Sequence, residues 1–301
     1  MIVMNVYLAE KYLGHPSRVT ALTALHNHTL IKATEDGRIT ARPFEESSEV
    51  AMCGHDGPVL GVAAFHETPF IVSGGTDTRL MIWNTETGEC VRTLIGHAEA
   101  VTAVALADEG RTIVSGGADG ALRFWDTLTG ALCAGSEWHL GPIRLLRALP
   151  HSDNVLVGAQ KAGSKSLIFQ VMNCRSGALV HAFEKTQVDA ACAVLLESGQ
   201  LLIGGADGKV TQWDVSSGRV MSAVETSSDG PVAALASHGE YAVLIKAPRQ
   251  LVMWDLTAQQ AVCVLEDFEQ PVSQVMITPD GRRVVAGCID GSIYIYHAAG
   301  V

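Results

Sequence analysis

The sequence GHAEAVTAVALADEGRTIVSGGADGALRFWD, residues 96–126, contains each part of a unit that recurs along the 301-residue chain. Two runs of apolar or β-branched residues, 101–106 and 112–115, flank the turn sequence DEGR and predict two strands. A second turn, GGADG, leads to a third such run at 121–125, and TLTG at 127–130 predicts a turn into a fourth strand. The unit therefore predicts a four-stranded antiparallel sheet whose inner strands are apolar nearly throughout.

One spacing repeats this unit along the chain, because an aspartate is followed six residues later by an aromatic residue. The pairs are Asp77 and Trp83, Asp119 and Trp125, Asp207 and Trp213, and Asp290 and Tyr296, while Asp36 and Arg42 keep the spacing only. A second column upstream contains Gly14-His15, Gly54-His55, Gly96-His97 and Trp138-His139. Met172 and Trp254 fill the remaining closing positions, so seven units of 41 to 47 residues end near 42, 83, 125, 172, 213, 254 and 296. A fixed period of this length is typical of repeat architectures.

The spacing from Gly-His to a closing Trp-Asp resembles that of the WD-repeat β-propeller family over essentially the full length of the chain. The resemblance implies an all-β fold in one domain, residues 1–301, built as a single seven-bladed β-propeller of four-stranded antiparallel blades. The last unit stops just after its third strand, at 298–301, whereas residues 2–13 form a strand-like run before the first repeat. We expect the N-terminal strand to complete the last blade and close the ring, with an open solenoid as the alternative.

Two sets of residues have the composition of a hydrolase triad: His55, Ser73 and Asp77, and His97, Ser115 and Asp119. A nucleophilic site needs one activated serine beside an oxyanion hole, but here the set occurs twice and precedes a tryptophan each time. The family resemblance implies that these residues instead hydrogen-bond in a row inside each blade. We therefore expect two structural networks, no catalytic residue and no enzymatic activity. The networks are His55, Ser73, Asp77 and Trp83, and His97, Ser115, Asp119 and Trp125.

Other units depart from this pattern, and no further chemical motif stands out. Lys32 and Arg42 occupy the serine and tryptophan columns of the first unit, so we expect apolar packing to hold such a blade. The Gly-Gly pairs that begin at Gly74, Gly116 and Gly204 are interpreted as turn formers between strands. His26-Asn-His28 lacks a third metal ligand, and no phosphate-binding glycine loop occurs. The sequence predicts no metal site and no cofactor.

Composition limits the environment and the partners. The formal net charge of -11 disfavours nucleic acid, because binding to the phosphate backbone depends on Lys and Arg. Seven scattered cysteines without a Cys-x-x-Cys pair favour a reducing compartment over a disulfide framework or a zinc cage. We find no signal-peptide pattern and no apolar run of membrane-spanning length. We expect a cytoplasmic protein, with the nucleus as the alternative location.

The expected binding surface is the face formed by the loops before each first strand and the turns between second and third strands. Acidic residues fall in these loops in units two to seven: Asp56, Glu99, Glu137, Asp189, Asp229 and Glu269. Cations interrupt this rim at Lys161, Lys165 and Arg249. Two readings stay open, namely ordinary polarity of surface loops and an electrostatic funnel for a basic segment of a partner.

The favoured function is a non-catalytic scaffold that presents this loop face to partner proteins or peptides. The alternative is an enzymatic or small-ligand-binding propeller that uses the central channel. That alternative requires a cluster of titratable or metal-binding side chains at the channel mouth, and the sequence offers acids without a coherent ligand set.

Overall fold

The computed structural model describes residues 5–13, 15–137, 141–149, 152–161, 163–164, 166–183, 190–196, 198–225 and 232–299. Within these ranges the regular secondary structure consists of β strands and one short 3-10 helix, η1 (Asp108–Gly110). The strands make seven four-stranded antiparallel sheets, the blades of a β-propeller. The chain divides into two compact units, residues 23–188 and residues 1–22 with 189–301.

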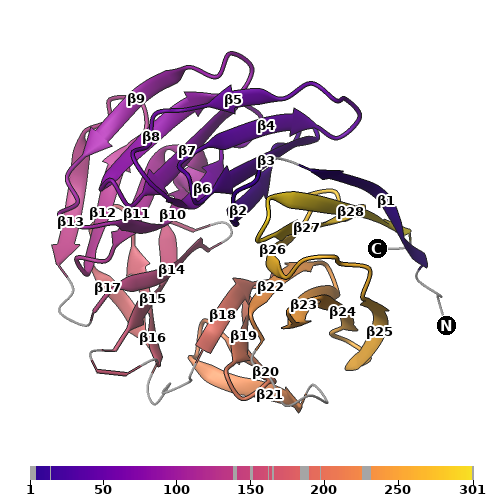
Figure 1. Ribbon diagram of the computed structural model, residues 1–301. Helices are drawn as coiled ribbons and strands as arrows, with labels where there is room; N and C mark the ends of the chain where they lie inside the picture. The colour runs from indigo at the N-terminus through magenta and orange to yellow at the C-terminus, as the bar shows by residue number, and fades with distance from the viewer. Residues whose placement is uncertain are drawn as a thin grey trace. The chain divides into compact units, whose positions relative to one another are not determined.

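The unit of residues 23–188 contains three complete sheets and most of a fourth. In each sheet, consecutive strands of the chain are neighbours (Figure 1). The complete sheets are β6 (Val59–Ala64), β7 (Phe70–Gly75), β8 (Arg79–Asn84) and β9 (Cys90–Ile95); β10 (Val101–Ala107), β11 (Thr112–Gly117), β12 (Ala121–Asp126) and β13 (Leu132–Glu137); and β14 (Ile143–Ala148), β15 (Asn154–Gln160), β16 (Leu167–Asn173) and β17 (Leu179–Ala182). The fourth sheet, β2 (Val19–Ala24), β3 (Thr29–Thr34), β4 (Ile39–Pro43) and β5 (Val50–Met52), contains the boundary between the units.

The second unit contains the three remaining sheets. Two of them are β18 (Ala190–Leu195), β19 (Gln200–Gly205), β20 (Lys209–Asp214) and β21 (Arg219–Glu225), and β22 (Ala234–His238), β23 (Tyr241–Ala247), β24 (Gln250–Asp255) and β25 (Gln260–Leu265). The last sheet has β26 (Val272–Ile277), β27 (Arg283–Cys288) and β28 (Ser292–Ala299), and its fourth strand is β1 (Asn5–Leu13).

Strand β1 completes this last sheet from the opposite end of the sequence. It pairs with β28 in antiparallel register from Asn5 opposite Ala299 to Leu13 opposite Ser292. The Nζ atom of Lys11 also forms an ion pair with Glu269, in the loop before β26. The predicted completion of the last blade by the N-terminal strand is confirmed, and the added strand covers an edge that would otherwise expose unpaired backbone groups.

The interpretation of the Gly-Gly pairs as turn formers is wrong, because these glycines end the second strand of their sheets. Gly74 and Gly116 each lie against the first residue of the next sheet's inner strand, and Gly204 lies against Val232, just before β22. A Cβ atom at Gly74 would lie 2.5 Å from Val101 Cγ1, and one at Gly116 would lie 2.4 Å from Ile143 Cγ2. Distances this short are not tolerated, so glycine is required for the close approach of neighbouring sheets.

Side-chain hydroxyls add a hydrogen-bonded link between neighbouring sheets. Thr102 Oγ1 donates to Gly116 O in its own sheet at 3.0 Å and is also bonded to Ile143 O in the next sheet. Ser273 Oγ bonds in the same way, 3.0 Å from Gly287 O and 2.7 Å from Val19 O. Each hydroxyl lies at a register shift of its inner strand. The shift therefore directs one polar group toward carbonyls of two sheets.

Deleting residues 1–12 is expected to destabilise the protein, because β28 would lose the strand that pairs along its length. Deleting residues 1–4 alone leaves the paired residues in place and serves as the matched control. Thermal unfolding of both forms measures the difference, and we expect the longer deletion to lower the midpoint by several degrees, consistent with a loss of about 1 kcal/mol or more. Equal midpoints for the two deletions would show that pairing of β1 does not contribute to stability.

Candidate functional site

The residues of the first triad-like set lie together inside the β6–β9 sheet. Trp83 Nε1 donates to Ser73 Oγ at 2.8 Å, and the same oxygen lies 2.7 Å from His55 Nε2. His55 Nδ1 lies 2.9 and 3.0 Å from the two carboxylate oxygens of Asp77. Because the indole can only donate, the serine hydroxyl is left to donate to Nε2, and Nδ1–H to donate to the carboxylate. The four side chains form one continuous row.

The β10–β13 sheet contains the same row and extends it by one cation. Trp125 Nε1 donates to Ser115 Oγ at 2.8 Å, His97 Nε2 lies 2.8 Å from that oxygen, and Asp119 lies 3.1 Å from His97 Nδ1. Arg123 Nη1 lies 2.9 Å from His97 Nδ1 and 3.2 Å from Asp119 Oδ2. This guanidinium has no counterpart in the neighbouring sheet, where Met81 occupies the equivalent register position.

Burial and hydrogen bonding set the protonation of the second row. Burial lowers the pKa of His97, and Arg123 adds to the effect while Asp119 opposes it. Burial disfavours the ionised form of Asp119, but the backbone N–H groups of Ala98 and Ala121, with His97, outweigh it and lower the pKa of that carboxyl. The row therefore combines an ionised carboxylate with an imidazole that resists protonation.

Neither serine of the two rows is available to a substrate. Ser73 and Ser115 are both 0% exposed, and each hydroxyl oxygen contacts an imidazole and an indole. The second glycine of each pair makes room for the row, because a Cβ atom at Gly117 would lie 2.2 Å from Asp119 Oδ1. Such a buried row, with each hydrogen-bonding atom occupied, stabilises a sheet and leaves no space for a tetrahedral intermediate.

The first sheet places a cation where these two sheets have serine. Lys32 lies opposite Thr40, as Ser73 lies opposite Met81, and its side chain is 1% exposed. The ammonium nitrogen has no hydrogen-bond partner among the residues that the structure describes. Burial lowers the pKa of Lys32, and Arg38 and Arg42 lower it further, against the opposing effect of Glu49 and Asp36. Burying a polar group without a hydrogen bond costs free energy, so we expect this amine to destabilise the sheet. The sequence shows a lysine at the serine position of the repeat but gives no reason for it.

The last sheet fills the same interior with aromatic rings. Tyr296 occupies the tryptophan position opposite Val284, and Ala286 occupies the serine position. Phe268 packs against Tyr294 and Tyr296 with ring centroids 4.9 and 5.8 Å apart. Phe268 precedes its sheet by the same four residues as His97, so its place in the histidine column could have been found from the sequence.

The charged residues predicted for the loop face lie in surface segments of their own units. Asp56, Glu99 and Lys161 are exposed in the unit of residues 23–188, and Glu269 and Arg249 are exposed in the other. Glu137 is instead the last residue of β13, because the pairing of β13 with β12 extends to Glu137, which lies opposite Ala121. Lys165, Asp189 and Asp229 lie outside the described residues.

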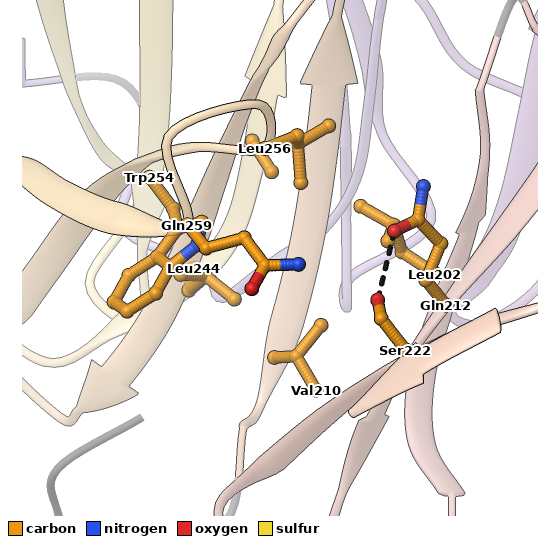
Figure 2. Close-up of a pocket in the computed structure, with 9 residues that line it drawn as sticks. Leu202, Val210, Gln212, Ser222, Leu244, Trp254, Leu256 and Gln259 are labelled. Carbon is orange, nitrogen blue, oxygen red and sulfur yellow. Dashed lines mark hydrogen bonds between the residues drawn. The ribbon is translucent and has the colours of Figure 1, made fainter. Parts of the chain in front are cut away.

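A small cavity lies between the β18–β21 and β22–β25 sheets (Figure 2). Its wall is apolar apart from Gln212, Ser222 and Gln259, and Ser222 Oγ donates to Gln212 Oε1 at 3.0 Å. Figure 2 shows the Gln259 carboxamide extending toward this pair beside the indole of Trp254. The cavity volume is about 20 Å³, which suits a water molecule and excludes a metabolite.

Replacing Asp119 by Ala is expected to reduce the free energy of unfolding by about 1 to 3 kcal/mol, because the buried partner of His97 would be lost. Asp290→Ala is the matched comparison, since Asp290 bonds to Ser292 and its sheet has neither the serine nor the histidine. We expect a smaller loss there. Urea denaturation of both variants measures the difference, and equal losses would contradict a stabilising role for the row.

Lys32→Met is expected to stabilise the protein, because it removes a buried amine that forms no hydrogen bond with any described residue and keeps a side chain of similar length. The gain should be on the order of 1 to 4 kcal/mol, as for other buried charges replaced by apolar groups. Lys161→Met, at an exposed lysine, is the control and should change stability little. A loss of stability in Lys32→Met would show that the ammonium group contributes a favourable interaction.

Comparisons with known proteins agree with this geometry. The family described as WD domain, G-beta repeat matches residues 47–84, 88–126 and 259–297. A WD repeat-containing protein 26 homolog from Arabidopsis thaliana is 29% identical over 98 residues, which cover 32% of this chain and 17% of that protein. Cilia- and flagella-associated protein 52 from Chlamydomonas reinhardtii is 28% identical over 161 residues, 52% of this chain and 25% of that protein.

The chain thus spans at most a quarter of the length of these two relatives. The likeness concerns the repeats, and two of the matched segments, 47–84 and 88–126, contain the residues of the two hydrogen-bonded rows. The chain therefore shares with WD-repeat β-propellers three repeats that match the family and seven four-stranded sheets.

Proposed function

We propose that the protein is a non-catalytic scaffold that binds partner proteins or peptides through its loops. The observation that carries this proposal is the complete burial of Ser73 and Ser115, whose hydroxyls are occupied by histidine and tryptophan. The two residue sets with the composition of a catalytic triad therefore form structural hydrogen bonds inside the sheets. WD-repeat propellers generally act by binding other proteins, and interaction surfaces of such folds lie in their loops.

The enzymatic or small-ligand alternative receives less support. Among the described residues, no group of three or more His, Cys, Asp or Glu side chains is arranged to hold a metal ion. The apolar cavity of Figure 2 has room for a water molecule. A small ligand bound inside the sheets needs a larger cavity than this one, with converging polar groups, so binding of a protein at the surface is the better proposal.

The acidic loops supply the chemistry of the proposed binding surface. Asp56 and Glu99 lie in the loops that precede β6 and β10, on one unit, and both are exposed. The backbone N–H of Asp56 is fixed by Asp77 at 3.2 Å, which holds the loop while the Asp56 carboxylate faces solvent. Carboxylates held in this way favour a partner segment that carries lysine or arginine.

The proposed environment is the cytoplasm, and the proposed partners are proteins. All seven cysteines are free thiols, which suits a reducing compartment. Acidic residues outnumber basic ones, 32 to 21, which disfavours nucleic acid as a partner. The described residues include no helix of the length and apolarity needed to cross a membrane.

Replacing Asp56 by Asn and Glu99 by Gln together should weaken binding of a basic partner segment mainly by slowing association, because the attractive field at these loops is reduced. The control replaces Glu67 and Glu86 by Gln, which removes the same charge from two exposed turns at the other end of the β6–β9 sheet. Surface plasmon resonance with a partner recovered from cells, at low and high salt, gives the rates. An unchanged association rate in the loop variant, without salt dependence, would refute the acidic-loop proposal.

A further inference from the structure

A groove of about 570 Å³ lies between the β6–β9 and β10–β13 sheets, within one unit. It is formed at the ends of the strands that carry the β6–β7 and β10–β11 turns, opposite the loops of Asp56 and Glu99. Phe65, Phe70 and Ile82 supply apolar surface to its lining. The two sheets lie side by side in Figure 1, so the groove follows from the packing of two consecutive repeats.

Large apolar side chains on both sides of this groove face solvent. Val91 of β9 is 57% exposed, and Leu128, in the turn between β12 and β13, is 85% exposed. Leu132, the first residue of β13, is 52% exposed as well. Exposed apolar side chains on both sides of one groove are typical of a protein interaction site, whereas single exposed apolar residues need no explanation.

The β10–β11 turn that borders the groove is held in a fixed conformation. Asp108, Glu109 and Gly110 have φ angles of 50°, 54° and 84°, so three consecutive residues are left-handed. Thr127 Oγ1 donates to Gly110 O at 2.8 Å, and a Cβ atom at Gly110 would lie 3.5 Å from Phe65 Cδ1. Non-glycine residues adopt this conformation at an energetic cost, which the surrounding contacts must offset. The groove is therefore preformed, which reduces the ordering needed when a ligand binds.

Two arginines of the groove have N–H groups that are not hydrogen-bonded to a carboxylate of the described residues. Arg111 is exposed and forms long ion pairs with Glu109 and Asp108, at 3.7 and 4.0 Å, which are beyond hydrogen-bonding distance. The Arg92 guanidinium forms no hydrogen bond or ion pair with any residue that the structure describes. Asp126, in contrast, already accepts the N–H and the hydroxyl of Thr129. The groove thus offers free donors beside an apolar floor.

We propose that this groove binds a segment of a partner protein that combines a large apolar side chain with a neighbouring carboxylate. The apolar side chain would pack between Phe65 and Leu128, and the carboxylate would accept hydrogen bonds from Arg92 and Arg111. The partner chemistry is opposite in charge to that proposed for the acidic loops, and the two surfaces lie at opposite ends of the same sheets. The chain would then hold two different partners at once.

The test is selection of a phage-displayed library of random twelve-residue peptides on the wild-type protein, with removal of clones that also bind Leu128→Asp. We expect the retained peptides to combine a large apolar residue with Asp or Glu. A synthetic peptide of the retained sequence should bind Leu128→Asp at least about tenfold more weakly than wild type. It should bind the Arg92→Gln, Arg111→Gln double variant about fivefold more weakly, as expected for two exposed charge pairs.

Two matched controls separate the groove from general surface effects. Leu179→Asp changes an exposed leucine on outer strand β17, and Arg79→Gln removes an exposed arginine at the other end of the β6–β9 sheet. Both should bind the peptide as wild type does. The proposal is overturned if no peptide depends on Leu128, if the retained peptides are rich in Lys or Arg, or if the controls weaken binding as much as the groove variants. These results would leave the acidic-loop proposal unaffected.

Discussion

The close approach of a β-branched residue to a glycine of the neighbouring sheet is the contact on which the rest of this structure depends. Four such pairs have a hypothetical Cβ atom 2.4 to 2.7 Å from a side-chain carbon: Gly74 with Val101, Gly116 with Ile143, Gly204 with Val232, and Gly287 with Val19. The contact fixes the distance between consecutive sheets and the position at which each inner strand begins. This contact therefore also determines where the loops before those strands lie and where the groove between two sheets forms.

Two chemically different interiors are compatible with this packing. The β6–β9 and β10–β13 sheets contain a row of histidine, serine, aspartate and tryptophan, whereas the last sheet packs Phe268, Tyr294 and Tyr296 in the corresponding space. A row of polar side chains in which each polar atom is hydrogen-bonded fixes the side-chain orientations and makes the sheet rigid. Aromatic rings instead bury apolar area and need few hydrogen bonds. Lys32 satisfies neither condition. The recurrence of the row therefore reflects how a sheet is held together, and its resemblance to a catalytic triad is a consequence of residue composition.

The sequence predicts what is repeated and misses what depends on neighbouring units. The strands were predictable from short local patterns, and the place of β1 from the missing fourth strand of the last unit. The row that contains the serines was expected from the family resemblance. The role of Gly74 was not, because Gly-Gly also forms turns and its contact, Val101, lies in the next repeat. The groove was missed for the same reason: Phe65, Arg92 and Leu128 come from separate turns and strands without a shared motif. Glu137 was assigned to a loop because outer strands have no closing signal.

The measurement that tests the central contact most directly is a double-mutant cycle between Gly74 and Val101 by urea denaturation. Gly74→Ala alone should reduce the free energy of unfolding by about 1 to 3 kcal/mol, because its Cβ atom would overlap Val101 Cγ1. In Val101→Ala that methyl group is absent, and a Cβ atom at Gly74 would then lie 3.0 Å from the remaining Cβ. We predict that the double variant is more stable than the sum of the single effects by about 1 kcal/mol or more. Simple additivity of the two losses would contradict the account.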